Sequence, residues 1–314
     1  MGEGIGSGRL KTPGYTDYDE KHKNDTSSSK YDRYDKDVDK YLRDELKCMN
    51  GRDTAKTRAE TKEVVDLISA GLGTTLNTNL GGSVRKNTYV EGISDVDQLL
   101  YVDNTKLAAM TPKDVLKYMH AKCIGKIDAL DIRQGKLALT ITKYDGQELQ
   151  FLPAIDAGNG KYRIPSGKDN KWSNPIDPKK FTDELTAANR ACGGNAIPAV
   201  KVIKKMIHNA GLDDKIGGYS IENYMIDAVK NSKFNSDTSI RVIVRETLST
   251  AARSVKHPTL DVTRQSRYID ERLGPANSVN RNYVSSELKN LRNKVNLADN
   301  EQNVSVWKDL IGDN

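Results

Sequence analysis

Two aspartates, Asp95 and Asp97, stand one residue apart in a segment rich in residues that favour strands. In a strand, residues two apart point to the same face, so the two carboxylates would lie side by side. Neighbouring carboxylates repel each other unless a cation binds between them. Mg2+ suits such a pair because it prefers carboxylate oxygens together with substrate phosphates. The pair therefore predicts a site for Mg2+ or Mn2+.

A glycine pair and a serine, Gly81-Gly82-Ser83, precede these aspartates. Glycines let backbone N–H groups come close to a phosphate, and the serine hydroxyl adds a further donor. Either feature alone is common, because Gly-Gly-Ser occurs in plain turns and Asp-x-Asp at exposed strand ends. Their succession in one short run favours a site that binds a phosphate group and a metal ion together.

The full run contains Gly82-Ser83, Thr88-Tyr89-Val90, Gly92 and Ser94-Asp95-Val96-Asp97. This run resembles the signature of the polymerase-beta-type nucleotidyltransferases. Within them it most resembles the bacterial cGAS/DncV-like nucleotidyltransferases (CD-NTases), relatives of animal cyclic GMP-AMP synthase and oligoadenylate synthase. The later segments that resemble this family are Leu152-Pro153-Ala154-Ile155, Ala199 to Lys205, Gly218 to Glu222 and Trp307 to Gly312. The resemblance covers residues 34 to 312.

The resemblance implies roles for the residues of the central run. Gly82 and Ser83 would hold the triphosphate of a nucleotide. Asp95 and Asp97 would bind Mg2+ or Mn2+ and act as catalytic residues.

The resemblance also implies two residues that contact the nucleotide from the second half of the chain. Lys204 would contact phosphate, and Tyr219 would stack on a nucleobase. Each has a plain structural alternative. Lys204 has close rivals in Lys201 and Lys205 and could be a solvated helix lysine, while Tyr219 could pack between lobes with its hydroxyl in water.

One position departs from the family pattern. The family normally places a third aspartate three residues before the proline of the Leu-Pro-Ala motif, where this chain has Gln150. An amide accepts a hydrogen bond, but it takes no proton at neutral pH and adds no negative charge. Glu148 lies two residues earlier, on the same strand face and about 7 Å along the strand.

Three interpretations of this departure stay open. Glu148 replaces the missing acid, or the enzyme uses two carboxylates while Gln150 positions the substrate, or catalysis is lost and a nucleotide-binding module remains. The plain alternative for Glu148 is a surface glutamate that follows the turn at Asp145-Gly146.

The first half of the chain is predicted to place these residues on a mixed sheet. Residues 1–30 are poor in aliphatic side chains, which predicts a disordered tail. Residues 31–165 are expected to form the nucleotidyltransferase catalytic core. Apolar residues at helical spacing predict helices over 34–50, around 64–68 and over 112–121. Strands are predicted over 88–90, 96–102, 137–142 and 148–155, with Asp145-Gly146 as a two-residue hairpin turn.

The second half, residues 166–314, is predicted to form a helical lobe. Its helices are predicted over 178–190, 198–209, 221–231, 237–254 and 284–296. The expected fold class is therefore α+β, a polymerase-beta-like nucleotidyltransferase core with a mixed sheet packed against a C-terminal helical lobe. The nucleotide-binding cleft is expected between the lobes.

Composition limits the classes of protein to which the chain can belong. It has 36% hydrophobic and 29% charged residues, and no apolar run approaches the roughly 20 residues that span a bilayer. With no secretory signal pattern either, we expect a cytoplasmic protein that does not bind membranes. Three widely separated cysteines predict neither a disulfide framework nor a zinc site. The net charge of +6 suits polyanionic ligands and leaves nucleic-acid binding open.

The resemblance implies a synthase that makes a cyclic oligonucleotide from nucleoside triphosphates and releases pyrophosphate. It also implies that the product is a second messenger in anti-phage defence, which activates a separate effector protein. Two other functions fit the same residues. One is a transferase that adds nucleotides to RNA or protein, and the other is a catalytically silent or activator-dependent nucleotide sensor, created by Gln150.

Overall fold

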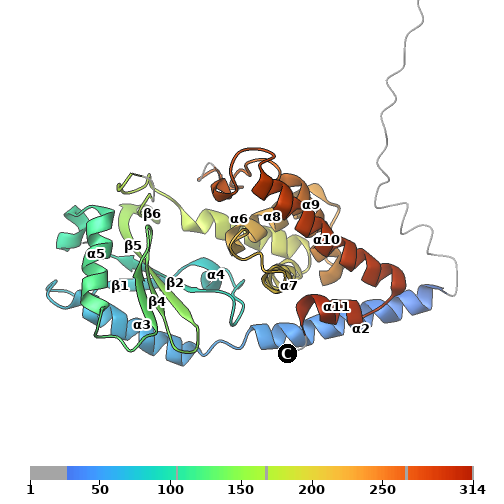
Figure 1. Cartoon of the computed structure of the whole chain (residues 1–314), viewed down its shortest axis with the longest axis horizontal. Helices are drawn as coiled ribbons and strands as arrows, with labels where there is room; N and C mark the ends of the chain where they lie inside the picture. The colour runs from blue at the N-terminus through green and yellow to red at the C-terminus, as the bar shows by residue number, and fades with distance from the viewer. Residues whose placement is uncertain (1–26, 104, 167–168, 266–267, 313–314) are drawn as a thin grey trace, which may run out of the picture.

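A computed structural model describes residues 27–103, 105–166, 169–265 and 268–312, and these form two lobes (Figure 1). The first described element is helix α2, Ser27–Met49, so residues 27–30 are helical and the prediction of a tail over 1–30 is wrong for them. The rest of that predicted tail, residues 1–26, lies outside the described residues. No helix in the described ranges combines the length and apolar character that a membrane span needs.

The first lobe is built on a mixed sheet of six strands within the described residues. Strand order is β1-β2-β5-β4-β3, and β6 pairs with an extension of β5. Only β2 and β5 run parallel, and every other pairing is antiparallel. The strands are β1 (Asn77–Leu80), β2 (Val96–Tyr101), β3 (Asp131–Gln134), β4 (Leu139–Thr142), β5 (Glu148–Gly158) and β6 (Lys161–Arg163).

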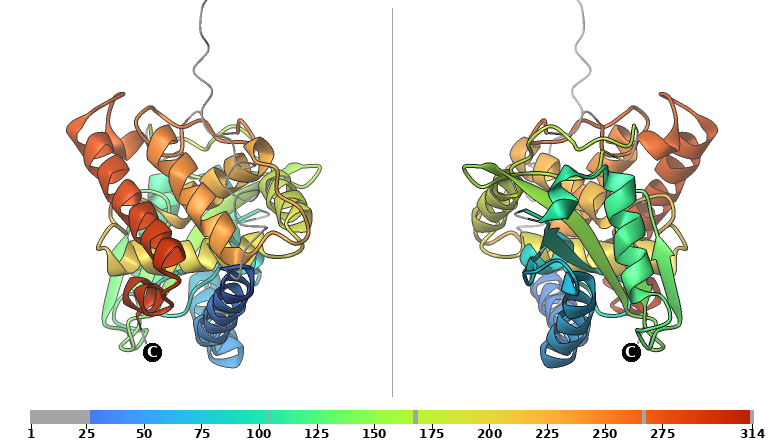
Figure 2. Two further views of the ribbon diagram at one scale, coloured as in Figure 1. Left: turned by 90° about the vertical axis from the view of Figure 1, so that its right-hand side faces the viewer. Right: turned by 90° about the vertical axis from the view of Figure 1, so that its left-hand side faces the viewer.

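Alternation along the central strands decides which face of the sheet is apolar. Val96 and Leu100 of β2 belong to a buried cluster that includes side chains of helix α3 (Thr54–Ser69) and helix α5 (Pro112–Cys123). Asp97, between them in the pleat, points to the opposite face. Seen from the sheet end, α5 lies in front of the strands, so the polar face looks toward the helical lobe (Figure 2).

The second lobe is a bundle around a separate buried cluster. Its helices are α6 (Pro178–Ala191), α7 (Ala196–Asn209), α8 (Gly218–Asn231), α9 (Ile240–Ser254), α10 (Val279–Glu301) and α11 (Ser305–Ile311). Helix α2 contributes its buried side chains to this cluster, although its residues precede the sheet in sequence. The expected α+β class, with a mixed sheet packed against a C-terminal helical lobe, is confirmed.

Two short elements differ from the sequence predictions. Residues 88–90, predicted as a strand, form no ladder: the Val90 N–H donates to Ser94 Oγ, and the Thr88 carbonyl accepts from Lys204 Nζ. Side chains thus satisfy backbone groups that a neighbouring strand would otherwise pair. The hairpin turn is also longer than predicted, because Lys143 N–H donates to the Gln147 carbonyl and three residues lie between them.

Candidate active site

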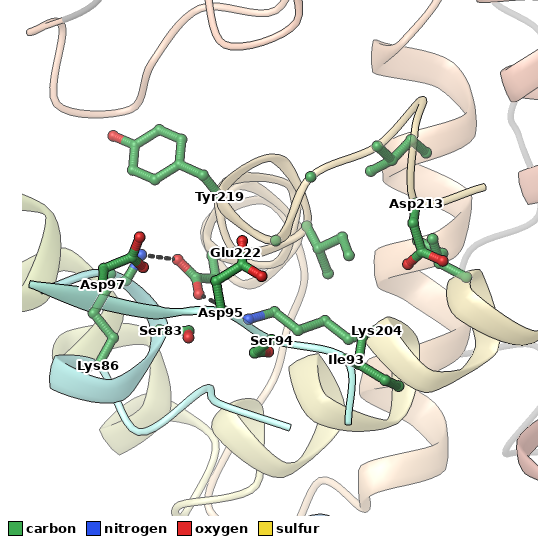
Figure 3. Close-up of a pocket in the computed structure, with 16 residues that line it drawn as sticks. Ser83, Lys86, Ile93, Ser94, Asp95, Asp97, Lys204, Asp213, Tyr219 and Glu222 are labelled. Carbon is green, nitrogen blue, oxygen red and sulfur yellow. Dashed lines mark hydrogen bonds and ion pairs between the residues drawn. The ribbon is translucent and has the colours of Figure 1, made fainter. Parts of the chain in front are cut away.

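One cavity of about 420 Å³ opens between the lobes (Figure 3). The sheet lobe contributes the turn at Gly82 and the start of β2, and the helical lobe contributes α7 and α8. The cavity is lined by six of the predicted site residues: Gly82, Ser83, Asp95, Asp97, Lys204 and Tyr219. Residues as far apart in sequence as Gly82 and Tyr219 therefore meet in one cavity.

The turn before β2 holds its shape through Asp97. The Gly81 N–H donates to the Asp97 carbonyl at 2.8 Å, and a one-turn helix, α4 (Gly82–Arg85), follows. Gly82 has φ +44°, and a Cβ at this position would overlap the Asp97 carboxylate. Only glycine therefore lets the turn approach Asp97 so closely.

Ser83 presents a buried hydroxyl in this turn. Its Oγ has no hydrogen-bond partner within the part of the chain that the structure describes. A buried polar atom without a partner costs free energy, and such atoms in a cavity often mark the place of a ligand. The hydroxyl thus offers a donor to a group that enters the cavity, as the sequence predicts for a triphosphate.

The two aspartates lie where the sequence places them. Asp97 is in β2, and Asp95 immediately precedes that strand. Burial, together with the negative charges of Glu148 and Asp97, raises the pKa of Asp95 to about 7. Burial also raises the pKa of Asp97, against the effect of nearby Lys86 and Lys204. The pair thus favours protonation unless a positive charge is added.

Gln150 and Glu148 both lie beside Asp95 rather than among the residues that line the cavity. Gln150 pairs with Asp97 in the β2–β5 register, and its Nε2 donates to Asp95 Oδ2 at 2.6 Å. Glu148 accepts from Thr142 Oγ1 at 3.3 Å, and its charge acts on Asp95. At the third-acid position the chain therefore has an amide that donates to a carboxylate, with a glutamate next to it.

Lys204 is buried and lies in an ion network that the sequence did not reveal. Its Nζ donates to the Thr88 carbonyl at 2.8 Å and lies 3.4 Å from Glu222 Oε1. Lys86, from the other lobe, pairs with Glu222 Oε2 (Figure 3). Thr88 Oγ1 donates to the same carboxylate. Because Lys86 and Glu222 are 136 positions apart, their pairing carries no local sequence signal. Because Lys204 is buried and bonded in this network, the alternative of a solvated helix lysine is excluded.

Glu222 is the fully buried centre of this network, with a side chain only 1% exposed. Burial raises the pKa of Glu222, but the charges of Lys86 and Lys204 outweigh it and lower the pKa. Two ammonium groups thus share one carboxylate at the cavity wall. The same two lysines also act on Asp97, so the network links the cavity wall to the carboxylate pair.

Tyr219 lies at the cavity with one ring face covered. Its ring stacks on Phe181 with the ring centroids 4.3 Å apart, and the tyrosine residue is 38% exposed. Lys86 Nζ lies 5.1 Å from the centre of the tyrosine ring, a cation–π distance. The position agrees with packing between elements and leaves part of the ring exposed. Stacking on a nucleobase stays a prediction.

The carboxylates fit a divalent cation only in partnership with a ligand. Among the described residues, no three His, Cys, Asp or Glu side chains are grouped so that they could hold a metal ion. Asp95 and Asp97 instead form an acceptor pair in a cavity that the Ser83 residue also lines. Mg2+ is commonly bound in this way, by one or two carboxylates plus substrate phosphates.

Comparison with solved structures identifies the fold. Escherichia coli DncV, in its 3′-deoxy GTP-bound form, matches with a TM-score of 0.61 at 12% identity over 96% of this chain and 91% of that chain. Bradyrhizobium diazoefficiens CdnG in complex with GTP matches with a TM-score of 0.60 at 12% identity over 82% and 90%.

A third match has a similar extent. The STING-associated CdnE c-di-GMP synthase from Capnocytophaga granulosa gives a TM-score of 0.56 at 16% identity over 91% and 92% of the two chains. No protein-family model matches the sequence, and no curated protein matches it. At these identities the likeness establishes the fold, which is that of the bacterial cGAS/DncV-like nucleotidyltransferases.

Proposed function

We propose that this chain is a metal-dependent nucleotidyltransferase that joins nucleoside triphosphates into a cyclic oligonucleotide and releases pyrophosphate. One observation carries the proposal. A single cavity brings together the Asp95 and Asp97 carboxylates, the Lys204 side chain of the opposite lobe and the Ser83 hydroxyl, which has no partner among the described residues. A triphosphate needs donors and positive charge, and a divalent cation needs carboxylates.

In this proposal the Gly82-Ser83 turn and Lys204 bind the triphosphate, and Tyr219 orients the base. Asp95 and Asp97 would hold Mg2+ or Mn2+. The bound cation would neutralise the charge that develops as pyrophosphate leaves the α-phosphate. Positioning by residues of both lobes supplies a large part of the rate, because it makes the attack effectively unimolecular.

The reaction requires an acceptor for the proton of the attacking hydroxyl. A 2′ or 3′ hydroxyl of one nucleotide forms a bond to the α-phosphate of another, and the bond to the pyrophosphate oxygen breaks. The proton goes to a carboxylate, and Glu148 beside Asp95 is our candidate because Gln150 cannot take a proton. A second attack within the cavity would close the ring.

The solved structures support this proposal through what they contain. CdnG was solved with GTP, DncV with 3′-deoxy GTP, and the Capnocytophaga enzyme is a c-di-GMP synthase. We extend these activities to this chain as part of the proposal. Anti-phage defence and a separate effector that responds to the product complete it.

A pyrophosphate-release assay with Mg2+ or Mn2+ and all four ribonucleoside triphosphates tests the chemistry. We expect release by the wild type, and a loss of at least about 100-fold in Asp95→Asn because charge stabilisation at the reacting phosphate is removed. Asp128→Asn changes an exposed aspartate outside the cavity and should keep full activity.

Two other results would reject the proposal. Triphosphate binding without pyrophosphate release, under either metal, would support the nucleotide sensor. Release only when RNA or a protein acceptor is added, with affinity for RNA that falls steeply as salt rises, would support transfer to a macromolecule.

A further inference from the structure

The cavity has a second end that the proposed chemistry leaves without a role. Tyr219 and Asp213 lie on opposite sides of Lys204 and Asp95 (Figure 3). Four isoleucines from both lobes line the cavity, and Ile207 and Ile216 stand within six residues of Asp213 in sequence; the set is Ile93, Ile207, Ile216 and Ile221. An apolar floor of this kind suits the flat face of a nucleobase rather than a phosphate.

Asp213 places a carboxylate at this end of the cavity (Figure 3). Its Oδ2 lies 2.9 Å from Nδ1 of His208. His208 is near the end of α7 and Asp213 is in the short loop between α7 and α8, so the two side chains are close in sequence as well. The histidine thus contacts one oxygen of the carboxylate at the cavity wall. An ionised carboxylate only accepts hydrogen bonds, and each oxygen can accept more than one. A base that binds here must therefore present donors to Asp213.

The bases differ in the donors that they present side by side. Guanine has two adjacent donors, the N1–H and the N2 amino group, which match the two oxygens of a carboxylate. Adenine and cytosine place an acceptor nitrogen next to their amino group, and that nitrogen would face the negative charge. Uracil has one N–H between two carbonyl oxygens. Guanine alone satisfies a carboxylate with two parallel hydrogen bonds.

We propose that Asp213 is a specificity-determining residue that selects a guanine nucleotide at the apolar end of the cavity. The inference rests on the proposed function, because it requires that the cavity binds nucleotides. It adds the substrate class of one of the two nucleotide positions. The other base, at the Tyr219 end, is not restricted by this carboxylate.

Calorimetric binding of α,β-methylene analogues of GTP, ITP and XTP tests the inference without turnover. Inosine lacks the N2 amino group, so the wild type should bind the ITP analogue about tenfold more weakly than the GTP analogue. In Asp213→Asn this ratio should fall toward one. The same variant should gain affinity for the XTP analogue, because an amide can donate to the C2 carbonyl of xanthine.

Asp214→Asn is the matched control. Asp214 is the neighbouring residue, pairs with Lys215 at 2.9 Å and does not line the cavity, so the wild-type ratio should persist. Equal affinity of the wild type for the GTP and ITP analogues, or an unchanged ratio in Asp213→Asn, would overturn the inference alone. Failure of the wild type to bind any of the three analogues would overturn the inference and the proposed function together.

Discussion

Asp95 illustrates how the residues of the site depend on one another. Its carboxylate is buried beside Glu148 and Asp97, and it accepts a hydrogen bond from Gln150. A third aspartate at position 150 would place another negative charge against Asp95. The amide avoids that repulsion and donates instead, while the glutamate one pleat away keeps an acid within the group.

This arrangement makes a paired prediction about Glu148 and Gln150. If Glu148 accepts the proton, Glu148→Gln should lower the rate constant of pyrophosphate release by about 100-fold or more. Adding Gln150→Asp to that variant should restore part of the rate, because an acid returns beside Asp95. The measurement is single-turnover release with saturating nucleotide, so that changes in binding do not enter.

The outcome separates the interpretations that the sequence left open. Full activity in Glu148→Gln would rule out Glu148 as the acid and favour catalysis by two carboxylates with Gln150 as a positioning residue. Asp128→Asn is the control, since Asp128 is exposed and lies outside the cavity, so its loss should leave the rate nearly unchanged.

Glu222 carries a second prediction at this scale. Glu222→Gln would leave Lys86 and Lys204 buried without their shared counter-charge, which should lower the free energy of unfolding by about 3–5 kcal/mol. Urea unfolding at about pH 7 measures this loss. Glu184→Gln, which removes the surface pair with Lys230, should cost less than about 1 kcal/mol.

The effect of Glu222→Gln should depend on pH in one direction. Because the folded-state pKa of Glu222 is lowered, its contribution is present above its ordinary pKa of 4.5 and is lost as pH falls through the lowered value. The difference in stability between wild type and variant should therefore shrink below pH 4.5. A difference that stays constant or grows on acidification would contradict the buried-pair account.

Sequence reasoning recovered much of the site at the residue scale. Gly82, Ser83 and the two aspartates stand in one short run with a readable spacing, and all of them line the cavity. Glu222 belongs to a segment that resembled the family, yet its role was missed. Its partners are Lys86 and Lys204, and only the folded chain brings the three together.

At the scale of elements, the turn at α4 decides whether the carboxylates can be approached. Gly82→Ala should lower stability by more than the about 1–2 kcal/mol of a positive-φ alanine, since its Cβ would displace the Asp97 carboxylate. Pyrophosphate release should fall with it. Gly73 has φ +76°, and a Cβ added there would meet no neighbouring atom. Gly73→Ala therefore measures the cost of a positive-φ alanine alone and should keep activity.

Urea unfolding and the release assay, run on both alanine variants, check this prediction. Equal losses of stability in the two, with activity retained in Gly82→Ala, would show that the approach of the turn to Asp97 is unimportant. A larger loss in Gly82→Ala alone would support the geometry of the turn.

The elements themselves were predictable where burial dictates their pattern. β2 and β5 place apolar side chains on the face covered by α3 and α5, so β-forming residues identified β2, and an alternating or apolar run identified β5. β1 was missed because it is a four-residue edge strand, Asn77–Leu80, with mostly exposed side chains. Its strand conformation comes from pairing with β2, which its own composition does not encode.

At the scale of the whole molecule, the two lobes have separate buried clusters and meet at the cavity. Helix α2 ties them together: its buried face packs in the helical cluster, while the Met49 carbonyl accepts from the Glu91 N–H just before Asp95. The sequence placed α2 with the catalytic core, because periodicity reveals which face is apolar but not what covers it. The division into units at residues 31–165 and 166–314 stays a prediction.

The two lobes enclose one cavity, in which we propose that two nucleotides are joined into a closed product. We would incubate the purified protein with labelled ribonucleoside triphosphates and Mg2+ or Mn2+, treat the reaction with phosphatase and separate the products. A phosphatase-resistant species that disappears in Asp95→Asn and persists in Asp128→Asn is the predicted result. Only phosphatase-sensitive nucleotides from the wild type, under both metals, would contradict the account.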